Sequence, residues 1–360
     1  MTATETPLDE ARVQQCAQRV FGAYVDSMLA LMIDLADRTG LLDALADGPG
    51  TSGQIAARAG IAERYARECL GALVTGGLVD YESAAATYVL PAEHAAVLAG
   101  EHAANLAPLS RIPTLLAHHV DEVADAARHG GGVPYERFRP DFTEVMDGLS
   151  REVFDQHLID AIVPLAPELQ AGLERGIRVA DIGCGTGHST VVLAAAFPAS
   201  TFVGYDLADD ALEVGRAEAR AAGLDNVTFE QLDVSELPDD PPFGAVVGFD
   251  VIHDQADPVG VLARVHRALA PGGVFLAVDI KASSRLERNA DNPVAPLLYG
   301  ISTLHCMTVS LARDGAGLGT VWGEELARQM LADAGFVDVT THDVPDDPLN
   351  QVYVARTATI

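Results

Sequence analysis

One short stretch constrains the fold more than any other: residues 181–187 read DIGCGTG and join an apolar strand to a helix predicted over residues 188–197. Glycine adopts backbone conformations that other residues avoid, and it lets backbone amides approach a ligand closely. The pattern is D-x-G-x-G-x-G and differs from the G-x-G-x-x-G of dinucleotide-binding turns. Alone it is only moderately specific, because any strand-to-helix turn can carry glycine.

The segments around this turn indicate the fold class. From residue 176 onward, short apolar strands alternate with helical segments, which predicts a doubly wound, Rossmann-like α/β domain with a parallel sheet. The predicted strands cover residues 178–182, 201–205, 227–231, 245–249 and 273–278. A ligand of such a sheet is expected at the carboxyl ends of the strands, near the topological switch point.

Aspartates follow three successive predicted strands. Asp206 ends the second strand about twenty residues after the glycine turn, where a carboxylate can accept hydrogen bonds from ribose hydroxyls. Asp233 ends the third strand, in a position to meet an adenine edge. Each aspartate alone could simply cap a turn or helix. Because Asp181, Asp206 and Asp233 all stand at the ends of successive strands, a chance arrangement is improbable.

On these motifs, residues 176–360 resemble the class I S-adenosylmethionine-dependent methyltransferases. Residues 269–273 (LAPGG) and 334–336 (AGF) are similar to two further turns of that family. The resemblance implies that the glycine turn cradles the methionine part of the cofactor, that the acid after the second strand holds ribose, and that the residues after the third contact adenine. The implied cofactor residues are Asp181, Gly183, Gly185, Gly187, Asp206 with its neighbour Leu207, Asp233 and Val234.

A second resemblance narrows the family. Residues 249–257 read FDVIHDQAD, which is similar to the H-D-W-x-D motif of small-molecule O-methyltransferases that carry an N-terminal winged-helix dimerisation domain. The resemblance implies that His253 is the general base for the acceptor hydroxyl and that Phe249 contacts the cofactor. The plant-type motif has tryptophan where this chain has Gln255, so the substrate wall differs.

The chemistry of methyl transfer is consistent with that assignment. In-line displacement from a sulfonium needs an acceptor held close in a water-poor site, and histidine titrates in the range that suits proton removal from a hydroxyl. Asp279 ends the fifth strand, next to the fourth in this fold, and is expected to orient His253, as a carboxylate does in the resembled family. A further carboxylate of the plant enzymes is not evident, since residues 321–323 read VWG. The alternative is that His253 only lines the cofactor site.

We expect no metal ion. Asp250, Asp254 and Asp279 could bind Mg²⁺ through oxygen atoms. However, the Asp-Asn pair of metal-dependent catechol-type enzymes is missing, because Ile280 follows Asp279. Asp257 is predicted to be an ordinary N-cap that opens the next helix.

The sequence predicts three parts. Residues 1–100 are expected to form an all-helical, winged-helix-like domain. Residues 101–175 are expected to form a helical linker that contributes to the pocket and the dimer, and residues 176–360 the methyltransferase domain. A helix starts near Ala62, and two wing strands are expected over residues 78–81 and 87–90. Such a module can read DNA or mediate dimerisation.

Charge favours dimerisation. The chain has 52 acidic and 23 basic residues, a formal net charge of −29, which repels a phosphate backbone. On the second helix, Arg64 and Arg67 are accompanied by Glu63 and Glu68. We therefore expect a homodimer through the N-terminal domain and no nucleic-acid partner.

The first helix carries an apolar stripe at spacings of three and four residues, and this stripe is expected to be buried. Its members are Val20, Tyr24, Met28, Leu31 and Leu35.

A long insertion, residues 281–320, lies between the fifth strand and the last long helix. The resemblance implies that it lines the acceptor pocket, although helix packing is an equal alternative for His305. Lys281, the only lysine of the chain, stands at its start, and its role is open.

Other features predict the cellular setting. The four cysteines are far apart, residues 1–10 lack the features of a signal peptide, and the uncharged run 292–312 is interrupted by proline and glycine. We expect a cytoplasmic protein without a membrane partner. The expected activity is S-adenosylmethionine-dependent O-methylation of a small, largely apolar metabolite, with S-adenosylhomocysteine as product. The alternatives are N- or C-methylation, or a winged-helix regulator that senses the cofactor.

Overall fold

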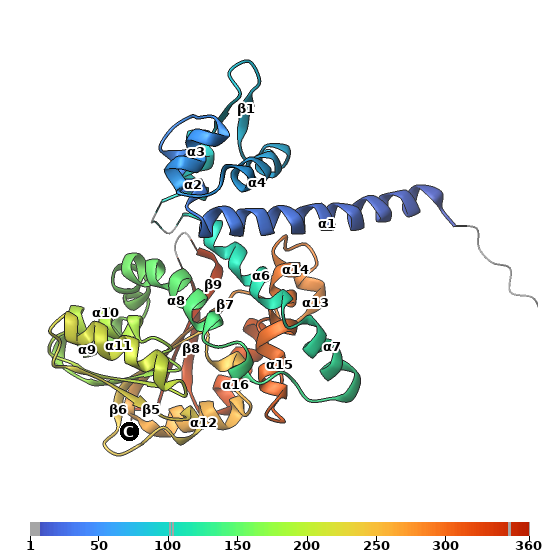
Figure 1. The fold of residues 1–360 in the computed structure, drawn as a ribbon. Coiled ribbons are helices and arrows are strands. Elements are labelled where there is room, and N and C mark those ends of the chain that lie inside the picture. Colours follow the sequence, from blue (N-terminus) through green and yellow to red (C-terminus); the bar gives the residue numbers. More distant parts are fainter. Residues whose placement is uncertain (1–7, 101, 103, 345–346, 360) are drawn as a thin grey trace, which may run out of the picture. The chain divides into compact units, whose positions relative to one another are not determined.

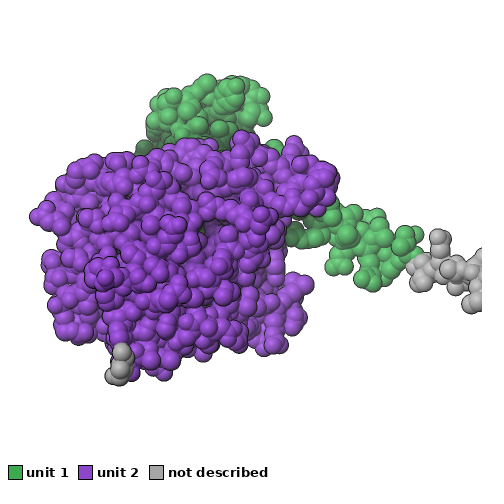
Figure 2. Space-filling model, turned by 90° about the horizontal axis from the view of Figure 1, so that it is seen from below, with its two compact units in different colours: residues 1–114 green, residues 115–360 purple. Residues whose placement is uncertain are grey.

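The computed structural model describes residues 8–100, 102, 104–344 and 347–359, so most of the N-terminal segment examined for a signal peptide lies outside the described residues. The chain divides into two compact units, residues 1–114 and 115–360, which Figure 2 shows in separate colours. The linker predicted over residues 101–175 is thereby split between the two units. The three-part division into domains stays a proposal.

The first unit is a helical bundle with a small two-stranded wing, as predicted (Figure 1). The wing strands pair antiparallel, with Tyr81 opposite Tyr88. A capping box between Thr51 and Gln54 starts the third helix, and a Cβ on Gly76 would lie 2.6 Å from Leu29. The elements are α1 (Glu10–Arg38), α2 (Leu41–Ala46), α3 (Ser52–Ala59), α4 (Glu63–Thr75), β1 (Asp80–Glu82), β2 (Thr87–Val89), α5 (Ala92–Leu98) and the 3-10 helix η1 (Ala107–Ser110).

The apolar stripe of α1 is not buried within the chain, contrary to the expectation from its spacing. Tyr24 and Met28 are 64% and 57% exposed, and only Asp34 and Ala36 of this helix are buried. The reason is length: a helix of 29 residues extends about 43 Å at 1.5 Å per residue. The small helices of the first unit pack only along its C-terminal part.

The second unit is built on a seven-stranded sheet with the order β5-β4-β3-β6-β7-β9-β8. The first five of these strands run parallel, whereas β9 runs antiparallel to both of its neighbours. The five parallel strands form the Rossmann-like sheet that the alternation of strands and helices predicts, while the antiparallel pair of β8 and β9 was not predicted. The strands are β3 (Arg178–Ile182), β4 (Thr201–Asp206), β5 (Val227–Gln231), β6 (Phe243–Phe249), β7 (Leu269–Ile280), β8 (Val337–Val344) and β9 (Asp347–Arg356).

Helices cover both faces of this sheet. Successive residues of a strand point to opposite faces, so Val179 packs in one buried cluster with α9 and α10, and Ala180 packs in another with α12 and α16. The longer helical elements are α7 (Val120–His129), α8 (Asp141–Val153), the π-helix η3 (Phe154–Ile162), α9 (Pro167–Arg175), α10 (His188–Ala196), α11 (Asp209–Ala221), α12 (Pro258–Ala268) and α16 (Gly323–Asp333).

Shorter helical elements complete the unit. The insertion predicted over residues 281–320 is largely helical, and a short helix crosses the boundary between the two units. These elements are α6 (Arg111–Ala117), α13 (Leu286–Asn289), α14 (Ala295–Ile301), the π-helix η7 (Ser302–Cys306), α15 (Met307–Leu311) and the 3-10 helices η2 (Tyr135–Arg137), η4 (Val163–Leu165), η5 (Val234–Glu236) and η6 (Ile252–Asp254). No helix in the described part of the chain combines the length and the apolar character needed to cross a bilayer.

Candidate active site

The glycine turn follows β3 and is built from three residues in the left-handed region. Gly183, Gly185 and Gly187 have φ angles of 63°, 56° and 77°. A Cβ on Gly183 would lie 2.2 Å from Val251, and one on Gly187 would lie 2.2 Å from the ring of Phe229. A Cβ on Gly185 would meet nothing within 4 Å. Two glycines are therefore required by packing, while the space beside the third is open for a ligand.

Asp181 lies beneath the turn, at 1% exposure. One oxygen, Oδ2, accepts hydrogen bonds of 2.7 Å from the hydroxyls of Ser189 and Thr190 in the first turn of α10, and Oδ1 has no hydrogen-bond partner. Burial raises the pKa of this carboxyl to about 6, although the two hydroxyls act in the opposite direction. Asp181 thus fixes the start of α10 relative to β3.

Asp206 connects the turn to the end of β4. Its Oδ2 accepts a 2.9 Å hydrogen bond from the amide of Gly185, and its Oδ1 accepts a 2.8 Å bond from the amide of Ala208. Burial raises the pKa of Asp206, while these amide donors partly offset that rise. Its neighbour Leu207 is 41% exposed. A carboxylate beside the open side of the turn is well placed to accept hydrogen bonds from a ligand.

The other predicted cofactor residues have different surroundings. Asp233 accepts hydrogen bonds from the amide and hydroxyl of Ser235 and so caps a 3-10 turn. Val234 is buried in the core cluster. Phe249, at the end of β6, contacts Phe154 edge-on, with ring centroids 4.9 Å apart.

His253 and Asp279 form a buried pair at the carboxyl ends of adjacent strands. Nδ1 of His253 lies 2.7 Å from Oδ1 of Asp279, and the two residues are 3% and 1% exposed. Burial alone would lower the pKa of His253, but the charges of Asp279 and Asp254 outweigh burial and raise this pKa well above its ordinary value. Asp279 thus holds the imidazole with Nδ1 toward the carboxylate, and Nε2 is left for other partners.

Nε2 of His253 faces Asp254 and Cys306. Asp254 Oδ1 lies 3.3 Å from Nε2, but this oxygen makes no hydrogen bond. Asp250, with a positive φ of 52°, places a further carboxyl close to the pair, and burial and the charge of Asp279 raise the pKa of Asp250 to about 7. Among the described residues, two groups have ligand atoms within 4.8 Å of one another: Asp250, His253 and Asp279, and His253, Asp254 and Cys306.

The insertion after β7 packs on the loop that carries His253. The amide of Gly319 donates to the carbonyl of His253 at 3.2 Å, and the hydroxyl of Ser310 donates to the carbonyl of Gln255 at 2.8 Å. Asp257 accepts from the amide of Gly260 and is the N-cap of α12, as predicted. Lys281 forms an exposed ion pair with Asp343, 2.7 Å away.

His305 is fully buried in a cluster of aromatic rings. Its imidazole stacks on Phe142, with centroids 3.6 Å apart, and meets Phe138 and Tyr135 edge-on at 4.7 and 6.1 Å. Neither ring nitrogen has a hydrogen-bond partner, and burial lowers the pKa of this histidine to about 4. His305 is therefore a neutral imidazole with both polar atoms unsatisfied.

Sequence reasoning missed the residues that η2 and α8 bring to the site. The hydroxyl groups of Tyr135 and Thr143 form a 3.1 Å hydrogen bond. Burial raises the pKa of Tyr135, and the nearby charges of Asp206 and Asp254 add to that rise. Asp147 accepts a hydrogen bond from Thr186 of the glycine turn. No motif marks these positions, since they come from helical segments that precede the sheet.

Two surface hollows have volumes of about 590 and 280 Å³, and the smaller one is lined by Lys281 and Ala282, directly after β7, and by Gln351 of β9. Both are bordered by Glu324 and Glu325 at the start of α16. We assign neither hollow to the site.

Comparisons with known families match both parts of the chain. Residues 27–100 match the Rv2258c-like winged HTH domain, and residues 173–335 match a methyltransferase domain. The chain therefore carries a methyltransferase domain behind a winged helix-turn-helix domain. This combination places it among the class I S-adenosylmethionine-dependent methyltransferases.

Curated relatives of this methyltransferase align with only part of the chain. The trans-aconitate 2-methyltransferase of Methylobacterium nodulans is 40% identical over 96 residues, which are 27% of this chain and 35% of the relative. The fatty-acid O-methyltransferase of Mycolicibacterium smegmatis is 37% identical over 113 residues, 31% and 40% of the two chains. The chain thus spans less than half the length of these two relatives.

Solved structures match the whole methyltransferase chain at low identity, which establishes the fold. Mitomycin 7-O-methyltransferase MmcR has a TM-score of 0.71 at 20% identity, covering 97% of this chain and 100% of the other. Human N-acetylserotonin methyltransferase in complex with S-adenosylmethionine has a TM-score of 0.67 at 19% identity, covering 100% of both chains.

Proposed function

We propose that this protein transfers a methyl group from S-adenosylmethionine to an oxygen atom of a small, largely apolar metabolite, with His253 as the general base. The observation that carries the proposal is the buried His253–Asp279 pair at the same edge of the sheet as the glycine turn. A solved relative of the same fold is named for its action on oxygen, the mitomycin 7-O-methyltransferase MmcR.

The cofactor residues are proposed from their positions around the turn. The open space beside Gly185 fits a ligand that approaches the backbone, and Asp206 would accept hydrogen bonds from ribose hydroxyls. Gly183 and Gly187 shape the turn, Asp181 anchors the helix behind it, and Leu207, Asp233, Val234 and Phe249 would border the nucleoside. S-adenosylmethionine, when bound, supplies an electrophilic methyl group and leaves as S-adenosylhomocysteine.

The proposed role of His253 is to remove the acceptor proton. As the acceptor oxygen forms its bond to the methyl carbon, its proton passes to Nε2, while Asp279 holds Nδ1 and stabilises the imidazolium. Asp254 adds negative charge to the cluster around His253, which favours a cationic methyl donor. The proposal assigns no metal ion to this cluster.

The test is methyl transfer from labelled S-adenosylmethionine to a panel of phenols, hydroxy acids and amines. We expect transfer to a hydroxyl group, and we expect His253→Ala to lose turnover while keeping its affinity for S-adenosylhomocysteine. Turnover that survives in His253→Ala would rule out the general-base role. Transfer to amines or carbon alone would favour the N- or C-methyltransferase alternative, in which a neutral amine needs little help from a base.

The winged helix is proposed to serve dimerisation and not DNA binding. Arg64 and Arg67 of α4 are each paired with a glutamate on the same helix, Glu68 and Glu63, at 2.5 Å. The alternative function, a regulator that senses the cofactor and reads DNA, requires free cations on this helix. A gel shift on generic DNA at low salt separates the two, since a shifted band would support the regulator.

We also propose a homodimer formed through the N-terminal unit and a cytoplasmic location. The dimer is supported by the exposed apolar side chains of α1, which would be covered by a second copy. They are Val13, Val20, Phe21, Tyr24, Val25, Met28, Leu31 and Leu35. The location is supported by four cysteines that are all free thiols, as suits a reducing compartment.

A further inference from the structure

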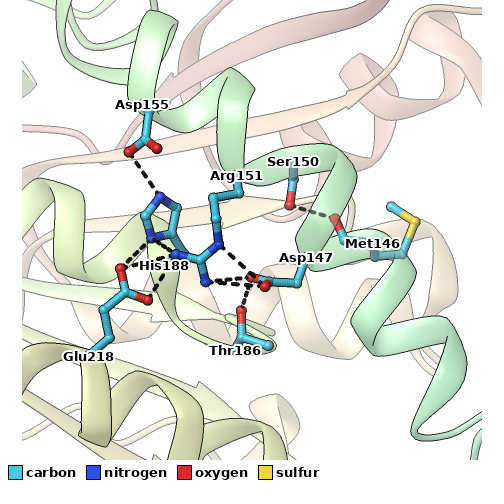
Figure 3. A network of polar contacts seen from close by, with 8 residues as sticks. All are labelled: Met146, Asp147, Ser150, Arg151, Asp155, Thr186, His188 and Glu218. Atoms are coloured by element: carbon cyan, nitrogen blue, oxygen red, sulfur yellow. Dashed lines mark hydrogen bonds and ion pairs between the residues drawn. The ribbon is translucent and has the colours of Figure 1, made fainter. Parts of the chain in front are cut away.

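A polar network joins α8 to the glycine turn (Figure 3). The hydroxyl of Thr186, inside the turn, donates to the carboxylate of Asp147 on α8. One turn further along α8, Arg151 holds that carboxylate with Nη2, which lies 3.1 Å from both oxygens of Asp147. The Asp147 carboxylate, which accepts the hydrogen bond from Thr186, is thus held in place by the guanidinium of Arg151.

The second amino group of Arg151 reaches the helices on the other side of the turn. Nη1 donates to Oε2 of Glu218 on α11 at 3.0 Å and lies 2.7 Å from Nδ1 of His188, the first residue of α10. Nδ1 of His188 is also 2.6 Å from Glu218, and Nε2 is 3.0 Å from Asp155 in η3. His188 is 7% exposed, so its ring is held on both sides in a largely buried position.

The network completes the attachment of the turn. The amide of Gly185 is bound on the sheet side, by Asp206. On the opposite side Thr186 is bound by Asp147, and Asp147 depends on Arg151 for its counter-charge. A glycine-rich turn resists distortion poorly on its own, because glycine permits many backbone conformations. Arg151 therefore controls both the position of the turn and the attachment of α8 to it.

We infer that Arg151 is a positioning residue for cofactor binding, which holds Thr186 and His188 against α8 so that the glycine turn keeps its binding geometry. The inference rests on the proposed function, in which this turn binds S-adenosylmethionine and its product. Arg151 acts through Asp147 and Thr186 and need not touch the cofactor itself. Lysine cannot replace it fully, because one ammonium cannot bridge the carboxylates of Asp147 and Glu218 in the fork geometry of a guanidinium.

The test is calorimetric titration of the full chain with S-adenosylhomocysteine. Arg151→Met is expected to raise the Kd by at least tenfold, and Arg151→Lys by a smaller factor. The matched control is Arg356→Met. Arg356 has a side-chain exposure of 32%, close to the 33% of Arg151, and it also pairs with two carboxylates, Glu168 and Asp338. Arg356 pairs with Val274 in the first half of β7, away from the carboxyl ends of the strands where the glycine turn lies. Its loss should therefore leave the Kd unchanged.

Thr186→Val separates positioning from general stability, because it removes one hydroxyl and keeps the side-chain shape. It should raise the Kd at least threefold in the wild-type background and have no further effect in Arg151→Met, since both changes break the same chain of contacts. If Arg151→Met fails to fold, Thr186→Val alone decides: a raised Kd supports the inference and an unchanged Kd overturns it.

Different results would overturn the role of Arg151 and the proposed cofactor. Wild-type protein that binds S-adenosylhomocysteine, with an unchanged Kd in a folded Arg151→Met, overturns the role of Arg151 alone. Additive losses from the two substitutions overturn it as well. Wild-type protein that does not bind S-adenosylhomocysteine overturns the proposed cofactor, and the role of Arg151 with it.

Discussion

Nδ1 of His253 and Oδ1 of Asp279 lie 2.7 Å apart, in a pair that is almost completely buried. The two residues are brought together because β6 and β7 are adjacent parallel strands, so that their carboxyl ends meet at one edge of the sheet. A buried carboxylate in this position both orients the imidazole and stabilises its protonated form.

Asp279→Asn should therefore lower kcat by about 10²-fold or more, in the range by which acid–base groups accelerate reactions. Removing the negative charge should also lower the pKa of His253, since Asp279 is a main cause of its raised value. The neutral, basic form of His253 would then persist to lower pH, and the acidic limb of the pH–rate profile would move toward lower pH. Asp343→Asn, which removes the exposed partner of Lys281, is the control. A profile that does not move would show that Asp279 does not set this pKa.

Asp181→Asn should change how stability depends on pH. The pKa of Asp181 is raised from 3.8 to about 6, so ionisation of this carboxyl is costlier in the folded chain than in the unfolded chain. Its contribution to stability is thus greatest below pH 4 and falls as the pH rises through 6, by about 3 kcal/mol for a two-unit shift. Urea unfolding of wild type and Asp181→Asn between pH 3.5 and 7.5 measures the difference. A difference that is constant with pH would contradict the assignment.

His305→Phe should leave the melting temperature unchanged or raise it. The substitution keeps a ring to stack on Phe142 and removes two buried nitrogen atoms that have no partner, and replacing an unsatisfied polar group by an apolar one is neutral or stabilising. If His305 hydrogen-bonds a polar group of the acceptor, the KM for the acceptor should rise about tenfold, a factor that corresponds to about 1.4 kcal/mol.

The control for this substitution is His266→Phe, because His266, in the last turn of α12, packs edge-on against Phe336 and not against the rings that surround His305. It should leave the acceptor KM as it is. A lower melting temperature for His305→Phe, with an unchanged KM, would indicate that His305 serves only packing.

Tyr24→Glu combined with Met28→Glu should convert the proposed dimer to a monomer, because both side chains lie on the exposed apolar stripe of α1. Light scattering coupled to size-exclusion chromatography measures the mass directly. Val259→Glu, at a 61% exposed position of α12, should leave the mass unchanged. A wild-type mass near 37.8 kDa, that of one chain, would contradict the dimer.

The five parallel strands and the glycine turn could be predicted from the sequence because they depend on local signals, whereas the antiparallel pair of β8 and β9 was not predicted. The whole glycine pattern lies within seven residues, 181–187. Asp206 and Asp279 can be identified because each stands at the end of an apolar strand. The proximity of Asp279 to His253 followed from the adjacency of their strands in this fold.

Other features depend on contacts between distant segments, which no local pattern reveals. Arg151 meets His188 and Glu218 only after α8, α10 and α11 have packed together. Tyr135 reaches the site from a helical segment that precedes the sheet, and Cys306 from the insertion between β7 and β8. The exposure of the α1 stripe was also unpredictable from its spacing, since periodicity identifies an apolar face but not what covers it.

The central claim, that the glycine turn and Asp206 bind S-adenosylmethionine, is tested most directly by calorimetric titration of wild-type protein and Asp206→Ala with S-adenosylhomocysteine. We predict stoichiometric binding by the wild type and a Kd at least 100-fold higher for Asp206→Ala, since that variant loses the carboxylate that lies beside Gly185. Absence of binding by folded wild-type protein, or equal affinity in the two proteins, would contradict the account.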